Sequence, residues 1–222
     1  ISQEDGDAII AALLAGEQIE GSLLNNTAYQ LDGDVDNGII AHEYGHGIST
    51  RLTGGRFNSG CLQNDEQMGE GWSDWFGLML TLQPGDQPQD IRGIGTYATG
   101  QATDGSGIRE APYSTDFSIN NYTYQDTDGN VSVPHGVGFV WATMLWEMTW
   151  DLINQYGFDP DLYNGTGGNN IAMQLVLDGL KLQPCNPGFE SGRDAILEAD
   201  MLANGGANQC LIWEAFARRG LG

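Results

Sequence analysis

The stretch Ala41-His42-Glu43-Tyr44-Gly45-His46-Gly47 places two histidines four residues apart, with a glutamate directly after the first of them. In an α-helix, residues i and i+4 lie one above the other on the same face, so the rings of His42 and His46 can reach one metal ion. Glu43 follows at about 100° round the helix, where its carboxylate can reach a water molecule beside that ion. This pattern is typical of zinc hydrolases. The alternative is a buried helix with two hydrogen-bonded histidines, but two of the chain's 3 histidines stand here.

A hydrolytic zinc site takes three protein ligands and leaves a fourth position for water. A third histidine six residues after the second is one solution, but this chain has a leucine at that position. The other solution is a glutamate from a later helix, and Met68-Gly69-Glu70-Gly71-Trp72-Ser73-Asp74 supplies it. Glu70 and Asp74 share a helix face, so we expect Glu70 to bind the metal while Asp74 accepts the far N–H of His42. A solvated glutamate is the alternative, but the surrounding tryptophans predict a buried helix, in which an unpaired carboxylate is costly.

Further motifs extend along most of the chain. In order, they are Asp34 to Ser49, Arg51 to Gly55, Cys61 to Gln63, Gly69 to Asp74, Trp141 to Glu147, Leu182 to Pro187 and Phe216 to Gly222. Together they resemble the fungalysin family of secreted metallopeptidases, from about residue 32 to the last residue. The resemblance implies a zinc-dependent endopeptidase of the thermolysin-like kind, which is secreted, acts on extracellular proteins or peptides, and is made as a zymogen with a propeptide.

The same resemblance implies roles for residues later in the chain. His135 follows Pro134, which suits the start of a helix, and thermolysin-like sites use a histidine at such a start to donate to the tetrahedral oxyanion. Arg109 is similar in order to the arginine that holds a substrate carbonyl in those enzymes. Tyr113 or Tyr44 is expected to contact the substrate as a second oxyanion donor, and the sequence does not choose between them. The alternatives are a capping or core histidine for His135 and a surface ion pair for Arg109.

Apolar periodicity predicts a mainly α-helical chain with about seven helices, long irregular loops and little sheet. The helices are expected at residues 4–15, 37–52, 66–83, 134–156, 170–182, 191–203 and 208–218. Residues 84–133 lack helical periodicity and are expected to line the cleft. By resemblance, the chain is the zincin-like C-terminal helical half of a thermolysin-like enzyme. Residues 1–222 are therefore interpreted as one metallopeptidase catalytic domain that belongs to a larger catalytic unit.

The charge of the chain excludes two classes of partner. There are 8 Lys+Arg against 30 Asp+Glu, which gives a net charge of -22. Contacts to phosphates need cations, so we expect no nucleic-acid partner. We also expect no membrane, because anionic lipids repel this surface and no apolar run approaches the roughly 20 residues of a span. No basic leader segment opens the chain, which is typical of a mature or excised piece, and we expect a monomer.

The 3 cysteines are an odd number, so one disulfide leaves a thiol over. Cys185 and Cys210 stand in adjacent C-terminal elements, and secreted proteins form disulfides. We therefore expect a Cys185–Cys210 disulfide and a remaining Cys61. Three buried free thiols are the alternative.

Calcium is an alternative metal at a second place. Asp32-Gly33-Asp34-Val35-Asp36 resembles the start of a calcium-binding loop, but the sixth position holds Asn37 where such loops have glycine. The twelfth position is Glu43, which the zinc interpretation already uses. We therefore expect Asp36 or Asn37 to cap the histidine-bearing helix, and Zn(II), not Ca(II), to be the principal metal.

Hypotheses of different classes follow from these residues. The first is a zinc endopeptidase in which Glu43 is the general base. The second is a zinc-binding fragment that is inactive alone, because it lacks the β-rich N-terminal part whose edge strand pairs with the substrate in this class. A zinc exopeptidase is a further alternative. Chelator-sensitive degradation of casein separates the enzyme from the binding fragment, and cleavage of a doubly blocked peptide separates endopeptidase from exopeptidase.

Overall fold

The computed structural model describes residues 3–18 and 31–222 of the chain. The chain divides into two compact units, residues 1–30 and 31–222. The described part of the first unit contains the helix α1 (Gln3–Leu14), which confirms the helix expected at residues 4–15. The sequence also predicts a loop or short extended segment at residues 17–31, most of which lies outside the described residues.

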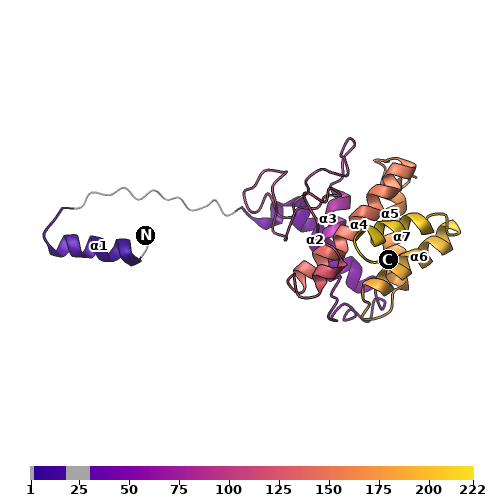
Figure 1. The fold of residues 1–222 in the computed structure, drawn as a ribbon, viewed down its shortest axis with the longest axis horizontal. Helices are drawn as coiled ribbons and strands as arrows, with labels where there is room; N and C mark the ends of the chain where they lie inside the picture. Colours follow the sequence, from indigo (N-terminus) through magenta and orange to yellow (C-terminus); the bar gives the residue numbers. More distant parts are fainter. Residues whose placement is uncertain (1–2, 19–30) are drawn as a thin grey trace. The chain divides into compact units, whose positions relative to one another are not determined.

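The second unit is built from α-helices joined by irregular segments (Figure 1). Its α-helices are α2 (Asn37–Leu52), α3 (Gly69–Leu80), α4 (His135–Tyr156), α5 (Gly168–Leu182), α6 (Phe189–Asn204) and α7 (Gln209–Arg218), and its 3-10 helices are η1 (Gly33–Val35) and η2 (Tyr124–Thr127). The prediction of a mainly α-helical chain is therefore confirmed. Among the described helices, none combines the length and the apolar character that crossing a membrane requires.

Helix α4 forms the centre of the second unit. Figure 1 shows α2 and α3 on one side of it and α5, α6 and α7 on the other. The ring of Trp141 on α4 contacts Trp72 of α3 and Phe189 of α6, each with centroids 5.0 Å apart, and Phe216 of α7 at 5.5 Å. Buried aromatic rings remove a large apolar area from water. The buried aromatic residues of α4, which recur at intervals of two to five positions along the helix, thus belong to the hydrophobic core.

Glycines allow α3 to approach both α2 and α4 closely. A Cβ atom added at Gly45 of α2 would lie 2.8 Å from the Cα atom of Ser73 on α3. One added at Gly71 of α3 would overlap the carbonyl oxygen of Gly138 on α4, and one added at Gly138 would lie 2.5 Å from the Cβ atom of Glu70. Real side chains do not tolerate such distances, so glycine at these positions lets the three backbones meet around Glu70.

Residues 84–133 are irregular except for η2, as the sequence predicts. In the described residues, extended pairing is limited to an isolated antiparallel bridge between Arg92 and Tyr113. Arg92 N donates to Tyr113 O at 3.0 Å, and Tyr113 N donates to Arg92 O at 2.8 Å. Near the C-terminus, the buried guanidinium of Arg219 donates to the carbonyls of Asn120 (2.6 Å) and Ser114 (3.2 Å). The irregular segment is therefore held at Tyr113 by the bridge to Arg92, and after Tyr113 by the bonds from Arg219.

A buried ion pair joins the C-terminus to α4. The side chains of Glu147 and Arg219 are 2% and 0% exposed. Arg219 Nε and Nη2 lie 2.9 and 2.6 Å from Glu147 Oε1, and Arg218 Nη1 lies 2.5 Å from Glu147 Oε2. A buried charge without its partner is costly, so these side chains depend on one another. Sequence reasoning missed this pair, although a glutamate in an otherwise apolar helix is a signal that could have found it.

The disulfide joins Cys61 to Cys185, whose Cα atoms are 4.6 Å apart, and Cys210 is free and exposed. A disulfide is thus present, but the expected Cys185–Cys210 pairing is wrong. The reason is that the loop after α2 returns to the connection between α5 and α6, where Asn186 N donates to Cys61 O at 2.8 Å. Nearness along the chain did not predict nearness in space.

Candidate metal centre

Asp36 caps the helix that carries the two neighbouring histidines. Its Oδ1 atom accepts the N–H of Gly38 at 2.9 Å, and its Oδ2 atom accepts the N–H of Ala98 at 3.1 Å. Such a cap stabilises a helix by about 1 kcal/mol, and the cap expected at this end of the helix is confirmed. In the segment compared with a calcium loop, Asp32 likewise accepts a backbone N–H, that of Asp34, at 3.0 Å. Asp32 and Asp36 thus both serve as backbone acceptors.

Three side chains from two helices converge on one point. His42 and His46 of α2 bring their Nε2 atoms to 3.1 Å from each other. The carboxylate of Glu70 on α3 lies 3.3 Å from His42 Nε2 and 3.4 Å from His46 Nε2. Ligands about 2.0–2.1 Å from a tetrahedral zinc ion lie about 3.3 Å from one another, so this donor set fits zinc. Within the described residues, no second set of three His, Cys, Asp or Glu side chains converges in this way.

Asp74 holds the ring of the first histidine. Its Oδ1 atom lies 2.6 Å from His42 Nδ1, and its side chain is fully buried. Because an ionised carboxylate can only accept, we assign the proton to Nδ1. Loss of a proton from Nε2 leaves neutral His42 with a lone pair directed at the point shared with His46 and Glu70. The spacing of Glu70 and Asp74 on α3 thus brings one carboxylate to each nitrogen of His42.

The electrostatics around these side chains favour a cation. Burial lowers the pKa of His42, but hydrogen bonds to Asp74 and Glu70 outweigh burial and raise this pKa to about 9. The hydrogen bond to His42 holds the pKa of Glu70 below its usual value. Burial and the charge of His42 lower the pKa of His46. Two carboxylates thus stabilise positive charge at one place, where a metal ion competes with a proton.

Arg109 and Tyr113, both from the irregular segment, bond to Asp74. Arg109 Nε and Nη2 lie 2.7 Å from Asp74 Oδ2 and 2.9 Å from Oδ1, and Nη2 lies 3.4 Å from Glu70 Oε2. The hydroxyl of Tyr113 lies 2.5 Å from Asp74 Oδ2, and its side chain is fully buried. This inward position of Tyr113 differs from the substrate-facing one expected from the sequence. Its physical reason is that a buried carboxylate needs donors on both oxygens.

His135 and Glu43 have access to solvent near the three converging side chains. His135 is the first residue of α4, its side chain is 57% exposed, and its Nε2 atom lies 3.6 Å from Glu70 Oε2. Glu43 is exposed on α2, and its charge acts on the neighbouring His46. Tyr44 is 71% exposed on the same helix. The arrangement gives a substrate access to a carboxylate and an imidazole beside the converging groups.

A surface cavity lies along the exposed side of α2 and extends to α5. Its volume is about 720 Å³, and it is lined by Glu43, Tyr44, Arg51, Leu177 and Lys181, among others. Glu43 therefore faces a hollow large enough for side chains of another molecule. Sequence reasoning did not predict this cavity, because it depends on how two distant helices sit against each other.

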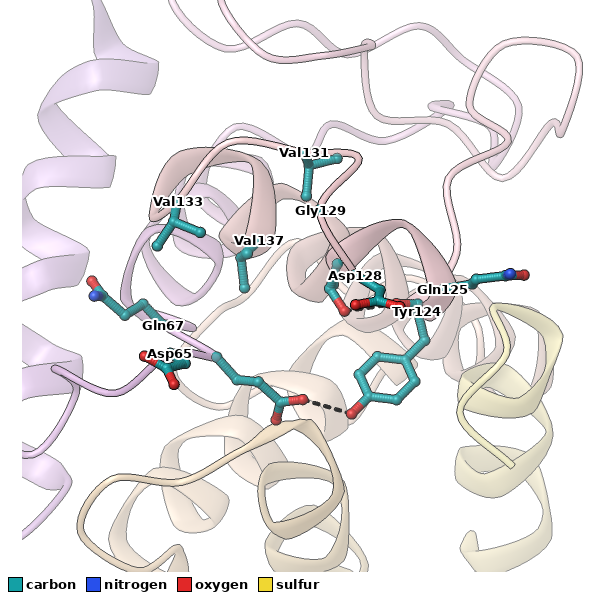
Figure 2. A pocket seen from close by; sticks show the side chains of 11 residues that line it. Asp65, Gln67, Tyr124, Gln125, Asp128, Gly129, Val131, Val133 and Val137 are labelled. Atoms are coloured by element: carbon teal, nitrogen blue, oxygen red, sulfur yellow. Dashed lines mark hydrogen bonds between the residues drawn. The ribbon is translucent and has the colours of Figure 1, made fainter.

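A second cavity, of about 640 Å³, lies beside the residues that precede α3 and α4 (Figure 2). Figure 2 shows Val131, Val133 and Val137 on the wall away from Tyr124. The hydroxyl of Tyr124 donates to Glu66 at 2.6 Å, and Glu66 also accepts a backbone N–H from the start of α6. Glu66 therefore anchors the loop before α3 and does not belong to that helix, which the sequence expected to begin there.

Two facing helices bring two histidines and a glutamate to one point, with an exposed glutamate directly after the first histidine, which is the arrangement of residues found in metallohydrolases of the zincin kind. The family described as Fungalysin metallopeptidase (M36) matches residues 11–222. The chain therefore belongs to the fungalysin metallopeptidase family, which confirms the resemblance seen in its motifs.

Similar proteins agree with this assignment. Extracellular metalloproteinase MEP of Neosartorya fischeri is 48% identical over 205 residues, which cover 89% of this chain and 32% of the relative. Extracellular metalloproteinase mep of Aspergillus fumigatus gives 48% over 205 residues with the same coverage. Extracellular metalloproteinase 2 of Arthroderma gypseum is 47% identical over 199 residues, or 86% of this chain and 31% of the relative. The chain thus spans about a third of the length of the curated relatives that it matches.

Proposed function

We propose that the chain provides the metal-binding part of a zinc endopeptidase that cleaves extracellular proteins or peptides. The observation that carries this proposal is the convergence of His42 Nε2, His46 Nε2 and the Glu70 carboxylate at 3.1 to 3.4 Å. This spacing is that of tetrahedral zinc ligands. Asp74 supports the same proposal, since it fixes the ring nitrogen that His42 presents.

In this proposal, the chain's own residues divide the work of peptide hydrolysis. A bound Zn(II) supplies Lewis-acid polarisation of the attacking water and the scissile carbonyl. The carboxylate of Glu43 takes a proton from that water and delivers it to the leaving amine. His135 donates from Nε2 to the oxyanion that develops on the carbonyl oxygen. Glu43 and His135 thus act on the attacking water and on atoms of the scissile bond, so each is expected to lower the barrier to cleavage.

Arg109 is proposed to contact a substrate carbonyl. Its Nε and Nη2 atoms are used by Asp74 and Glu70, whereas Nη1 has no hydrogen bond among the described residues. Nη1 is therefore the atom proposed to contact a bound peptide, on a side chain that is 6% exposed in this structure. The pairing with Asp74 would hold the guanidinium in place before a substrate arrives, which lowers the entropy cost of the contact.

The compartment, the precursor form and the oligomeric state of the protein are also proposals. The similar proteins are named extracellular metalloproteinases, and a disulfide joins Cys61 to Cys185, which suits an oxidising compartment. We therefore propose secretion, synthesis with a propeptide, and a monomeric enzyme. We also propose that the chain works within a larger catalytic unit, because it spans about a third of its relatives.

Paired variants of Glu43 and Glu70 test the proposed function. Glu43→Gln is expected to keep zinc and to lower casein cleavage by about 10²- to 10⁴-fold, the usual contribution of a general base. Glu70→Ala is expected to lose zinc and activity together, since it removes a ligand. Glu198→Gln, on the exposed side of α6, is the matched control and should change neither. Metal content and turnover are measured on the same preparations.

Four outcomes contradict the proposal in different ways. Full turnover in Glu43→Gln refutes the role of Glu43 as general base. Full zinc content in Glu70→Ala refutes the role of Glu70 as a metal ligand. Zinc binding without any chelator-sensitive cleavage, measured on the larger catalytic unit that contains this chain, identifies a binding module instead. Cleavage confined to peptides with a free terminus identifies an exopeptidase.

A further inference from the structure

The buried phenol of Tyr113 has a specific partner at the metal centre. Its side chain is 0% exposed, and its hydroxyl lies 2.5 Å from Asp74 Oδ2. Burial and the charge of Asp74 raise the pKa of Tyr113 well above its usual value, so the hydroxyl remains a donor. The hydroxyl of Tyr113 therefore meets the carboxylate that holds His42 and is shut off from solvent.

The carboxylate of Asp74 is held on both oxygens. Oδ1 accepts from His42 Nδ1 at 2.6 Å and from Arg109 Nη2 at 2.9 Å. Oδ2 accepts from Arg109 Nε at 2.7 Å and from Tyr113 at 2.5 Å. With two donors on each oxygen, the carboxylate cannot rotate without breaking charge-assisted bonds. Removal of the phenol hydroxyl leaves Arg109 as the single donor to Oδ2. The restraint on the carboxylate plane of Asp74, which orients the ring of His42, is then weaker.

The position of Tyr113 is itself fixed from three sides. Its ring packs on Phe139 of α4 with centroids 5.2 Å apart. Its backbone forms both bonds of the bridge with Arg92, and the next carbonyl, of Ser114, accepts from the buried Arg219. An irregular segment is therefore rigid at the residue that contacts Asp74. Rigid support of this kind is what a metal-ligand arrangement needs to keep its geometry.

We propose that Tyr113 is a positioning residue that sets the zinc affinity of His42 by fixing the carboxylate plane of Asp74. The inference rests on the proposed zinc site. Partners of a ligand histidine typically change metal affinity by 10- to 100-fold. Tyr113 acts one step further from the metal, through Asp74, so about tenfold is expected for loss of its hydroxyl.

Tyr113→Phe and Tyr122→Phe form a matched pair for the test. Both rings pack on Phe139 with centroids 5.2 Å apart. Within the described residues, only the Tyr113 hydroxyl of the two has a hydrogen bond. Zinc affinity is measured by competition with a chromophoric chelator on metal-free protein, with Glu70→Ala as the baseline for zinc bound elsewhere. Tyr113→Phe should weaken zinc about tenfold, and Tyr122→Phe should leave it unchanged.

A double-variant cycle separates positioning from a general structural role. If Tyr113 acts through Asp74, then Tyr113→Phe should lower zinc affinity by less than about threefold in an Asp74→Asn background. An equal loss in both backgrounds overturns the proposal, as does equal zinc affinity in the Tyr113→Phe and Tyr122→Phe variants. Failure of the unmodified protein to bind zinc with His42, His46 and Glu70 refutes the proposed function itself, which is a different result.

A measurement on the unmodified protein covers the case in which Tyr113→Phe does not fold. The hydroxyl proton of Tyr113 and the Nδ1 proton of His42 share one carboxylate, so zinc at His42 should polarise Asp74 and shift the hydroxyl resonance. That resonance is followed by nuclear magnetic resonance while zinc is added. A shift that saturates with the site supports the proposal, and an unmoved resonance overturns it.

Discussion

Two buried carboxylates of the core, Asp74 on α3 and Glu147 on α4, each bond to arginine, yet only one of them belongs to the metal centre. Asp74 is shared by Arg109, Tyr113 and His42, and the far nitrogen of His42 faces Glu70 and His46. Glu147 is shared by Arg218 and Arg219, whose remaining donors go to Asp151 and to backbone carbonyls.

The difference shows that a buried carboxylate–arginine pair is not by itself a sign of function. Around Glu147, each group ends on another group of the same chain, so the cluster is closed. Around Asp74, the imidazole of His42 has two nitrogens, and the carboxylate occupies only one of them. A ring whose second nitrogen faces the other converging donors turns a structural ion pair into support for a ligand.

The largest expected effect is on the closed cluster. Glu147→Gln leaves Arg219, whose side chain is 0% exposed, without its carboxylate. Loss of one partner from a buried ion pair typically costs about 3–5 kcal/mol. Urea unfolding of the metal-free protein should show this loss, while zinc affinity of the folded protein stays unchanged. A changed zinc affinity with intact stability would mean that the two clusters are not independent.

The next effect distinguishes the metal centre. Asp74→Asn should weaken zinc by about 10- to 100-fold, because His42 loses the ionised acceptor of its Nδ1 proton. This corresponds to about 1.4–2.7 kcal/mol of binding free energy. Asp151→Asn, which alters the partly exposed ion pair with Arg218, is the control and should change zinc affinity by less than twofold. The zinc affinity of both variants is measured by competition with a chelator. Equal affinities would show that Asp74 does not support zinc binding.

The smallest effect concerns a third buried carboxylate, Asp200, which bonds to amides and not to arginine. Burial raises its pKa, but hydrogen bonds from Asn208 and Asn204 outweigh burial and lower it. A lowered carboxyl pKa contributes stability above the unfolded pKa of about 4, and this contribution is lost as the pH falls through the folded pKa. Asp200→Asn should therefore cost roughly 1–2 kcal/mol at neutral pH and less in acid.

Unfolding free energies at several pH values test that third prediction. Asp104→Asn, at an exposed position of the irregular segment, is the matched control. The difference between the two variants should shrink as the pH falls below about 4. A difference that is constant with pH would show that Asp200 stabilises the turn between α6 and α7 without its charge.

Most of the fold could be predicted from the sequence because the helices follow local rules. The apolar spacing of α4 and its glycine stop at Gly157 are visible in the letters, and both ends were predicted. Helix α3 was expected from Glu66 and begins at Gly69, because the side chain of Glu66 instead bonds to Tyr124 and to the backbone of Phe189. Partners more than 50 residues away decided that boundary, and periodicity contains no information about them.

The candidate site divides in the same way. The pairs His42–His46 and Glu70–Asp74 were predictable because residues four apart share a helix face. The contact of Tyr113 with Asp74 was not, since it depends on an irregular segment that bridges to Arg92 and returns to α3. The disulfide partner of Cys61 depended on similar long-range packing. Site residues that share a helix face can be predicted from their spacing in the sequence. Contacts from loop residues depend on long-range packing and could be identified only in the structure.

The crosslink between Cys61 and Cys185 closes a loop of 124 residues along the chain. By chain entropy alone, a loop of about that size lowers the free energy of folding by roughly 5 kcal/mol. None of the three converging donors is a sulfur, so a thiol reductant and a chelator attack different properties of this molecule. The reductant cleaves the disulfide and destabilises the fold but does not modify the side chains proposed to bind zinc. The chelator removes zinc and leaves the disulfide intact. For the proposed zinc endopeptidase, inactivation by a reductant should thus be reversed by reoxidation, and inactivation by a chelator by added zinc.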